Sequence, residues 1–122
     1  MLVVMDVIGL FDNIPPKEGV ECVENGLEDN VNSKVPKEFI ARLLEVILQY
    51  SIFEFNQKLY QQQVGTSMGC RPAPPYANNF MARKIDNKIL EIIEKYSQNN
   101  ENPLKFMKRF LDDLFLIFTG ST

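Results

Sequence analysis

The sequence predicts an α+β domain in which helices pack on one face of an antiparallel sheet. Apolar runs with strand character lie near both ends of the chain, and three helical patterns and a hairpin pattern lie between them. The expected order is strand, helix, helix, strand, strand, helix, strand, strand, which favours an antiparallel arrangement. With 122 residues and 45% apolar content, the chain fits one domain over residues 1–122 that can bury a core.

Residues 1–8 are β-branched and apolar apart from Asp6, and they predict a buried strand. Prolines then introduce a short helix over 16–28, because proline suits the first helical position. A polar loop over 29–35 separates it from a second helix, which Pro36 opens. Two apolar stripes follow the 3.6-residue period, one in each helix: Val20, Val23 and Leu27, and then Phe39, Ile40, Leu43, Leu44, Ile47 and Leu48.

Residues 53–55 and 58–60 predict a hairpin around Asn-Gln, a poorer turn than Asn-Gly, so its register stays open. Two glycines and three prolines make 63–75 a constrained loop. The longest helix is expected over 75–97, and the last twenty residues predict strand, turn at Asp112-Asp113, and strand. The apolar face of that helix comprises Tyr76, Phe80, Ile85, Ile89, Ile92, Ile93 and Tyr96.

Composition excludes several classes of function. The net charge of −3 argues against a surface that is basic throughout, so any grip on nucleic acid must come largely from elsewhere. Histidine is absent, which removes imidazole as a base or zinc ligand. Cys22 and Cys70 lack zinc spacing and predict reduced thiols in an intracellular protein. No apolar run approaches the roughly eighteen residues of a membrane span, and the start lacks signal-peptide features.

Three acids stand in apolar runs. Asp112 and Asp113 interrupt the run from Phe110 to Phe118, and Asp6 lies in the first strand. An ionised carboxylate in such a place needs a partner or a metal. We therefore expect adjacent central strands to bring the three carboxylates together around a hard cation, as two-metal phosphoryl transfer requires. The alternatives are that the pair caps a turn and that Asp6 marks the point where its strand reaches solvent.

Weaker signals lie elsewhere. The loop from Gly65 to Gly69 could present backbone N–H groups to a phosphate or base, although it lacks the Walker pattern and a tight structural turn fits equally well. Arg71 beside it fits a phosphate contact or a solvated position. Phe11 fits core packing as well as a place in the site.

Taken together, these segments resemble reverse transcriptases. Met5-Asp6-Val7 through Phe11-Asp12-Asn13-Ile14-Pro15 resembles motif A. Gln63 to Gly69, with Ala73-Pro74 and Tyr76 to Met81, resembles motif B, and Arg109 to Phe115 resembles motif C. The residues of these motifs are most similar to those of Penelope-like retroelements. The three motifs occur in the expected order and cover nearly the whole chain.

The resemblance implies a polymerase palm with two Mg²⁺ ions, or Mn²⁺, at the carboxylates. Asp6 and Asp112 would coordinate both ions, Asp113 would complete the cluster, and the carbonyl of Val7 would be a further ligand. An RNA template, a DNA primer and deoxynucleoside triphosphates would be the partners, and no membrane would be involved. The resemblance also implies an intracellular location, in the nucleus.

The resemblance also assigns nucleotide and template contacts. Phe11 would be the steric gate that rejects a 2′-hydroxyl, and Met68, Gly69 and Arg71 would line the nucleotide and template. Two departures are Met68, where many reverse transcriptases have glutamine, and Phe110, where tyrosine is common.

The resemblance spans only motif A to motif C, so fingers and thumb are expected outside this partial domain. We expect this stretch alone not to polymerise. One alternative is a decayed or domesticated palm fold that serves as an interaction module. Another is an RNA-dependent RNA polymerase palm, against which the aromatic Phe11 argues, because such enzymes usually carry a polar residue there.

Overall fold

The computed structural model describes residues 1–28, 34–97 and 103–119. The chain divides into two compact units. We call Met1–Ile8 with Met81–Thr122 the sheet unit, and Gly9–Phe80 the helical unit. Both contain antiparallel strands together with helices, so the predicted α+β class is confirmed.

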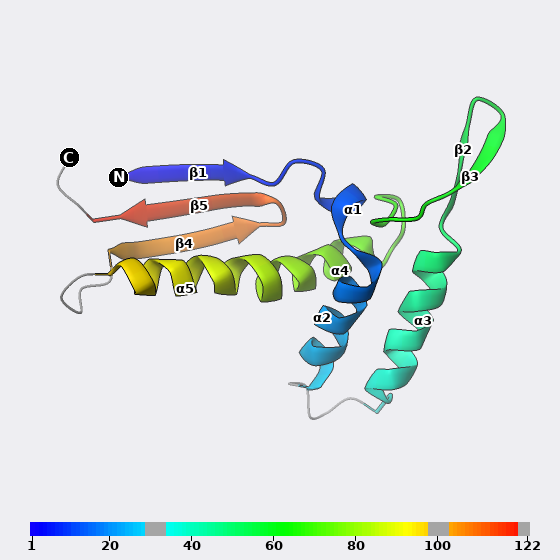
Figure 1. The fold of residues 1–122 in the computed structure, drawn as a ribbon, viewed down its shortest axis with the longest axis horizontal. Helices are drawn as coiled ribbons and strands as arrows, with labels where there is room; N and C mark the ends of the chain where they lie inside the picture. Colours follow the sequence, from blue (N-terminus) through cyan, green and yellow to red (C-terminus); the bar gives the residue numbers. More distant parts are fainter. Residues whose placement is uncertain (29–33, 98–102, 120–122) are drawn as a thin grey trace. The chain divides into compact units, whose positions relative to one another are not determined.

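The sheet unit is built on three antiparallel strands (Figure 1): β1 (Leu2–Asp6), β4 (Leu104–Phe110) and β5 (Asp113–Phe118). Their order is β1-β5-β4, so the last strand of the chain is central. Strand β1 pairs with β5 along its full length, and its final residue, Asp6, stands opposite Asp113. The expectation that the two acid-bearing runs become neighbouring strands is confirmed.

The expectation that β1 is a buried central strand is wrong for the described sheet. Strand β1 lies at an edge, and only Val3 among its residues is half-buried. Leu2 and Val4 are 60% and 66% exposed. Alternate residues of a strand point to opposite faces, so a strand is buried throughout only where both faces of its sheet are covered.

The turn between β4 and β5 consists of Leu111 and Asp112, one residue earlier than predicted. Phe110 pairs with Asp113, which is already the first residue of β5. Leu111 has a φ of 56°, in the left-handed region that glycine usually occupies in such hairpins. The hairpin therefore carries backbone strain at its tip, next to the acid pair.

Helices cover one face of this sheet. Leu114 and Leu116 of β5 are almost fully buried, whereas the alternate Phe115 and Ile117 are more than a third exposed. Figure 1 shows α5 (Asn87–Tyr96) running alongside β4 and β5. It follows the π-helical segment η1 (Met81–Asp86), whose Met81 is fully buried. The expected packing of helices on one sheet face is present here.

The helix predicted over 75–97 is three consecutive helical segments, of which α4 (Ala73–Phe80) is the first. Segment η1 has π geometry, which the 3.6-residue pattern did not predict. Ile85, Ile89 and Ile93 are half-buried along η1 and α5. Ile92 and Tyr96, which belong to the predicted apolar face, are left uncovered, since they are 48% and 74% exposed.

The helical unit contains α1 (Leu10–Asn13), α2 (Pro16–Glu28) and α3 (Lys37–Gln49), and α2 packs against both α3 and α4. The helices α2 and α3 are confirmed, whereas the single turn of α1 was not predicted. In α3, Leu44 and Leu48 are buried but Phe39 and Leu43 are exposed, so two of the six residues of the predicted stripe are turned outward. The buried apolar residues of this unit are Leu10, Ile14, Val20, Cys22, Ala41, Leu44, Leu48, Ala73, Tyr76 and Ala77.

The predicted hairpin is also present, as β2 (Ile52–Phe55) and β3 (Lys58–Gln61). Its register is now defined, with Phe55 opposite Lys58 and Phe53 opposite Tyr60. Asn56 and Gln57 both have positive φ, as a two-residue type I′ turn requires. Residues 29–33 of the predicted polar loop lie outside the described residues.

Among the helices in the described ranges, none combines the length and apolar character needed to cross a membrane.

Candidate metal centre

Strand pairing brings three carboxylates to one end of the sheet. Asp6 ends β1, Asp113 begins β5 directly opposite it, and Asp112 lies in the adjoining turn. One carboxylate oxygen from each of the three lies within 4.8 Å of the others. The predicted convergence of these side chains is confirmed, and it joins segments that are far apart in the sequence.

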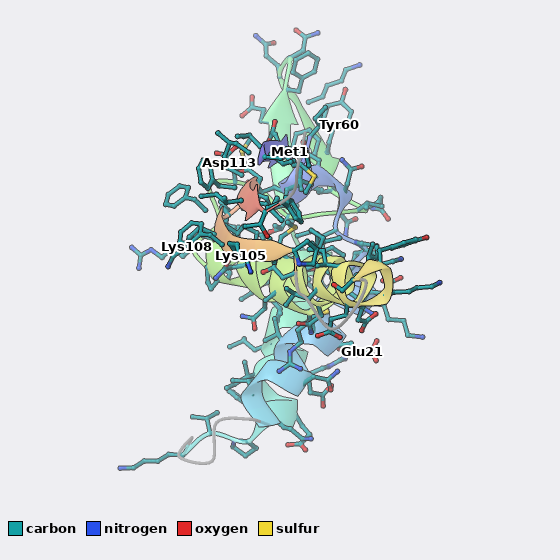
Figure 2. All side chains as sticks on the ribbon, turned by 90° about the vertical axis from the view of Figure 1, so that its left-hand side faces the viewer. Met1, Glu21, Tyr60, Lys105, Lys108 and Asp113 are labelled. Carbon is teal, nitrogen blue, oxygen red and sulfur yellow. The ribbon has the colours of Figure 1, made fainter. Side chains whose placement is uncertain are left out.

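The carboxylates are accessible. Asp6 and Asp113 are exposed, and Asp112 is half-buried. Because Asp113 alternates with the buried Leu114, it points to the sheet face that α5 does not cover, and its cross-strand partner Asp6 shares that face. Figure 2 labels Asp113 on β5 and Lys105 and Lys108 on the neighbouring β4.

The cluster has an unbalanced negative charge. Within the described ranges, no lysine or arginine forms an ion pair with Asp6, Asp112 or Asp113. Two unit charges about 4 Å apart repel by roughly 1 kcal/mol even in bulk water, and by more near a protein surface. Carboxylate oxygens are the ligands that Mg²⁺ and Ca²⁺ prefer, so the donor set fits a hard divalent cation.

Backbone hydrogen bonds fix the turn beside β1. The Val7 N–H donates to the Asp112 carbonyl oxygen at 3.0 Å, just beyond the last ladder pair. This bond holds the end of β1 against the turn, and Val7 itself is half-buried. The acid-bearing segments are thus joined by main-chain bonds as well as by their register.

Two residues that were not predicted to belong to the site support this end of the sheet. Arg109 of β4 forms an ion pair with Asp86, the last residue of η1, at 2.9 Å. A sequence signal was available, because Arg109 shares the strand face of Met107, which is directed toward the helices, and a cation there needs a partner. Asp86 had no comparable signal, since an acid in a helix is ordinarily solvated.

The residues predicted to contact nucleotide and template belong to the helical unit. Phe11 is half-buried, and its carbonyl oxygen accepts a hydrogen bond from the Thr66 N–H at 2.7 Å. Gly65 donates to the Ile14 carbonyl oxygen at 3.0 Å and has a φ of 77°. A Cβ at Gly65 would lie 2.2 Å from the Phe11 carbonyl oxygen, so only glycine fits this close approach.

The remaining predicted contacts are open to solvent. Residues 62–72 contain no helix or strand, which confirms the predicted loop up to residue 72. Its predicted end at 75 is wrong, because residues 73–75 already belong to α4. Met68 is 72% exposed, and Gly69 and Arg71 are also exposed. The loop therefore presents these three positions at the surface while its Gly65-Thr66 segment is bonded to the Phe11–Ile14 backbone.

The helical unit also contains a buried tyrosine whose hydroxyl group is unusual. Tyr76 of α4 is 2% exposed, and its hydroxyl has no hydrogen-bond partner among the described residues. Burial, with a smaller contribution from Cys22, raises the pKa of Tyr76 to about 12. A Cβ at Gly19 of α2 would lie 2.0 Å from the Tyr76 hydroxyl oxygen, so glycine is what lets the ring pack there.

A scan of the chain against models of protein families gives no match, and a search of curated proteins gives none either.

Proposed function

We propose that this chain is the palm segment of a reverse transcriptase, in which Asp6, Asp112 and Asp113 hold two Mg²⁺ ions. The observation that carries the proposal is the meeting of three carboxylates, none ion-paired within the described residues, on the open face of an antiparallel sheet. The reaction class, nucleotidyl transfer to a primer, is inferred from the order and the residues of the three sequence motifs. The proposal thus combines a geometry that fits a metal with a sequence that resembles a polymerase.

When bound, the ions would activate the primer 3′-hydroxyl as a nucleophile and neutralise negative charge on the departing pyrophosphate. The protein itself holds three carboxylates close together on a fixed strand pair. It thereby places negative charge in advance where the ions bind, so that the ions and the reacting groups are correctly positioned. The carbonyl of Val7, adjacent to Asp6, is proposed as a further ligand. The face that carries Asp6 and Asp113 is exposed, which suits access by a primer end and a nucleotide.

The motif resemblance also assigns residues to selection of the substrate. In this proposal Phe11 lies under the sugar of the incoming deoxynucleotide and excludes a 2′-hydroxyl. Met68, Gly69 and Arg71 line the base pair and template. These assignments come from the motif resemblance, and the exposure of the 68–71 loop is compatible with them.

The test has two stages. Mn²⁺ binding to this chain is measured by titration, and we expect Asp112→Asn to weaken it strongly while Glu54→Gln, an exposed acid on the β2–β3 hairpin, leaves it unchanged. A longer protein that includes this chain is then assayed for extension of a DNA primer on an RNA template.

Extension that needs Mg²⁺ or Mn²⁺ and is lost in Asp112→Asn supports the proposal. Metal binding without any extension by the longer protein would favour the interaction-module alternative. Extension with ribonucleotides only would favour an RNA polymerase palm. Metal binding that ignores Asp112→Asn would overturn the metal site itself.

A further inference from the structure

Arg109 connects the acid-bearing turn to the helix beneath the sheet. Its side chain is 9% exposed, and its Nε donates to both carboxylate oxygens of Asp86, each at 2.9 Å. Its Nη1 donates to the Leu111 carbonyl oxygen, also at 2.9 Å. One guanidinium group thus bonds the end of η1 and the first residue of the turn at the same time.

The turn requires such a restraint. Leu111 adopts a φ of 56°, which is strained for a residue other than glycine and persists only where its surroundings enforce it. Both carbonyls of the turn are engaged, Leu111 by the Arg109 side chain and Asp112 by the Val7 N–H. The two bonds fix the peptide units on either side of the Asp112 Cα, from which its carboxylate projects.

The π geometry of η1 sets the position of Asp86. A π turn holds more residues than an α turn, and each residue adds about 100° of rotation in an α-helix. The segment Met81–Asp86 therefore changes which downstream side chains face the sheet, and Asp86 at its end meets Arg109. A regular α-helix through the same residues would direct position 86 elsewhere.

We propose that Arg109 is a positioning residue for the metal centre, and that it acts by clamping the Leu111–Asp112 turn to Asp86. This inference rests on the proposed function, because it assigns Arg109 a role toward the ions held by Asp6, Asp112 and Asp113. Arg109 acts through the backbone, since its charge is paired with Asp86 and none of the three carboxylates is ion-paired to it. Lysine cannot replace it fully, because an ammonium lacks the planar fork that reaches two acceptors.

The experiment measures Mn²⁺ affinity in the 122-residue chain at a temperature where circular dichroism shows each variant folded. We expect Arg109→Gln to weaken Mn²⁺ binding by about tenfold or more, as removal of outer-shell support typically does. Arg109→Lys and Asp86→Asn should each give an intermediate loss, because each keeps one of the two connections. Arg42→Gln is the matched control, since it removes an exposed arginine ion pair with Glu45 on α3.

Amide hydrogen exchange provides the second readout. In Arg109→Gln the amides of residues 111–113 should exchange faster than in the parent chain, while those of α2 and α3 should not change. A merely structural role would lower the melting temperature and leave Mn²⁺ affinity intact in the molecules that remain folded. If Arg109→Gln does not fold, Asp86→Asn and Arg109→Lys decide the question by the same affinity measurement.

The same Mn²⁺ measurements separate the role of Arg109 from the metal site itself. A parent chain that binds Mn²⁺ and loses it in Asp112→Asn, but keeps it undiminished in the folded Arg109 and Asp86 variants, overturns this inference and leaves the metal site standing. A parent chain whose Mn²⁺ binding ignores Asp112→Asn, or that binds none, overturns the proposed function and this inference with it.

Discussion

The helical unit and the sheet unit are stabilised in different ways. Among the described residues, ten buried apolar side chains belong to the helical unit and only three, Met81, Leu114 and Leu116, to the sheet unit. The sheet unit has a more extensive antiparallel ladder, over three strands, and the partly buried Arg109–Asp86 ion pair. The unit with the smaller core thus carries the charged cluster.

This difference has a physical consequence. Apolar burial contributes stability without fixing a particular geometry, whereas hydrogen-bonded pairs and ion pairs are directional. The sheet unit therefore gains positional precision from contacts that depend on few residues, and it should be the more sensitive of the two to single substitutions. Substitutions in each unit can test that asymmetry.

Leu116→Ala should produce the largest effect. The side chain is 1% exposed, and such truncations cost about 2–5 kcal/mol of the free energy of unfolding. Because only three buried apolar side chains are found among the described residues of this unit, we expect hydrogen exchange to accelerate across β1, β4, β5 and α5 while α2 and α3 stay protected. Leu44→Ala in α3 is the matched control and should act mainly on the helical unit. Equal acceleration in both units for either variant would show that they unfold together.

Tyr76→Phe tests the core of the helical unit through pH. The pKa of Tyr76 is about 12 in the folded chain against 10.0 for the free side chain, so the folded state retains its proton longer. The contribution of Tyr76 to the free energy of unfolding is therefore fully present below pH 10 and is lost as the pH rises toward 12. The full difference in pKa corresponds to about 2–3 kcal/mol. Tyr76→Phe should lose this part of the alkaline decline. At pH 7 it should be neutral or stabilising, since the hydroxyl has no partner. Chemical denaturation of both chains at pH 7, 10 and 11.5 checks this, and parallel alkaline curves would contradict it.

Phe11→Ala asks whether the helical unit selects the sugar. In a complete polymerase that includes this chain, we expect the ratio of ribo- to deoxynucleotide incorporation to rise at least about tenfold, equivalent to roughly 1.4 kcal/mol, because alanine leaves room for the 2′-oxygen. Primer extension with each nucleotide type measures the ratio, and the melting temperature is recorded beside it. An unchanged ratio with a strongly lowered melting temperature would make Phe11 a packing residue of its half-buried site.

Asp113→Asn should produce the smallest effect, in the opposite direction. Asp113 faces Asp6 across the β1–β5 pair, and like charges in directly opposite positions destabilise a sheet by about 0.2–1 kcal/mol. Without metal, the variant should therefore melt slightly higher than the parent chain, and with Mn²⁺ the order should reverse. Glu54→Gln on the β2–β3 hairpin, where the facing residue is Leu59, should show neither change. A lower melting temperature for metal-free Asp113→Asn would indicate a structural hydrogen-bonded network instead.

The local elements and the identity of the acids followed from the sequence. Period-2 and 3.6-residue patterns, proline at helix starts and the Asn-Gln turn predicted α2, α3, both hairpins and their order, because these signals arise between neighbours in the chain. The three carboxylates were identifiable because a charge interrupting an apolar run is costly if that run is buried, so it needs a partner or access to solvent. The exposure of β1, Ile92 and Tyr96 was not predictable, since periodicity says which residues share a face but not whether anything covers that face.

The assembly of the site depends on long-range contacts that no local pattern specifies. The pairing of Asp6 with Asp113, the shift of the turn to Leu111–Asp112 and the bond from Val7 to Asp112 depend on a strand register between distant segments. The Arg109–Asp86 ion pair depends in addition on the π-helical geometry of η1, which no residue pattern predicted. Local propensity is an average over short-range interactions, whereas a strained turn and a partly buried ion pair exist only where long-range contacts hold both partners in place.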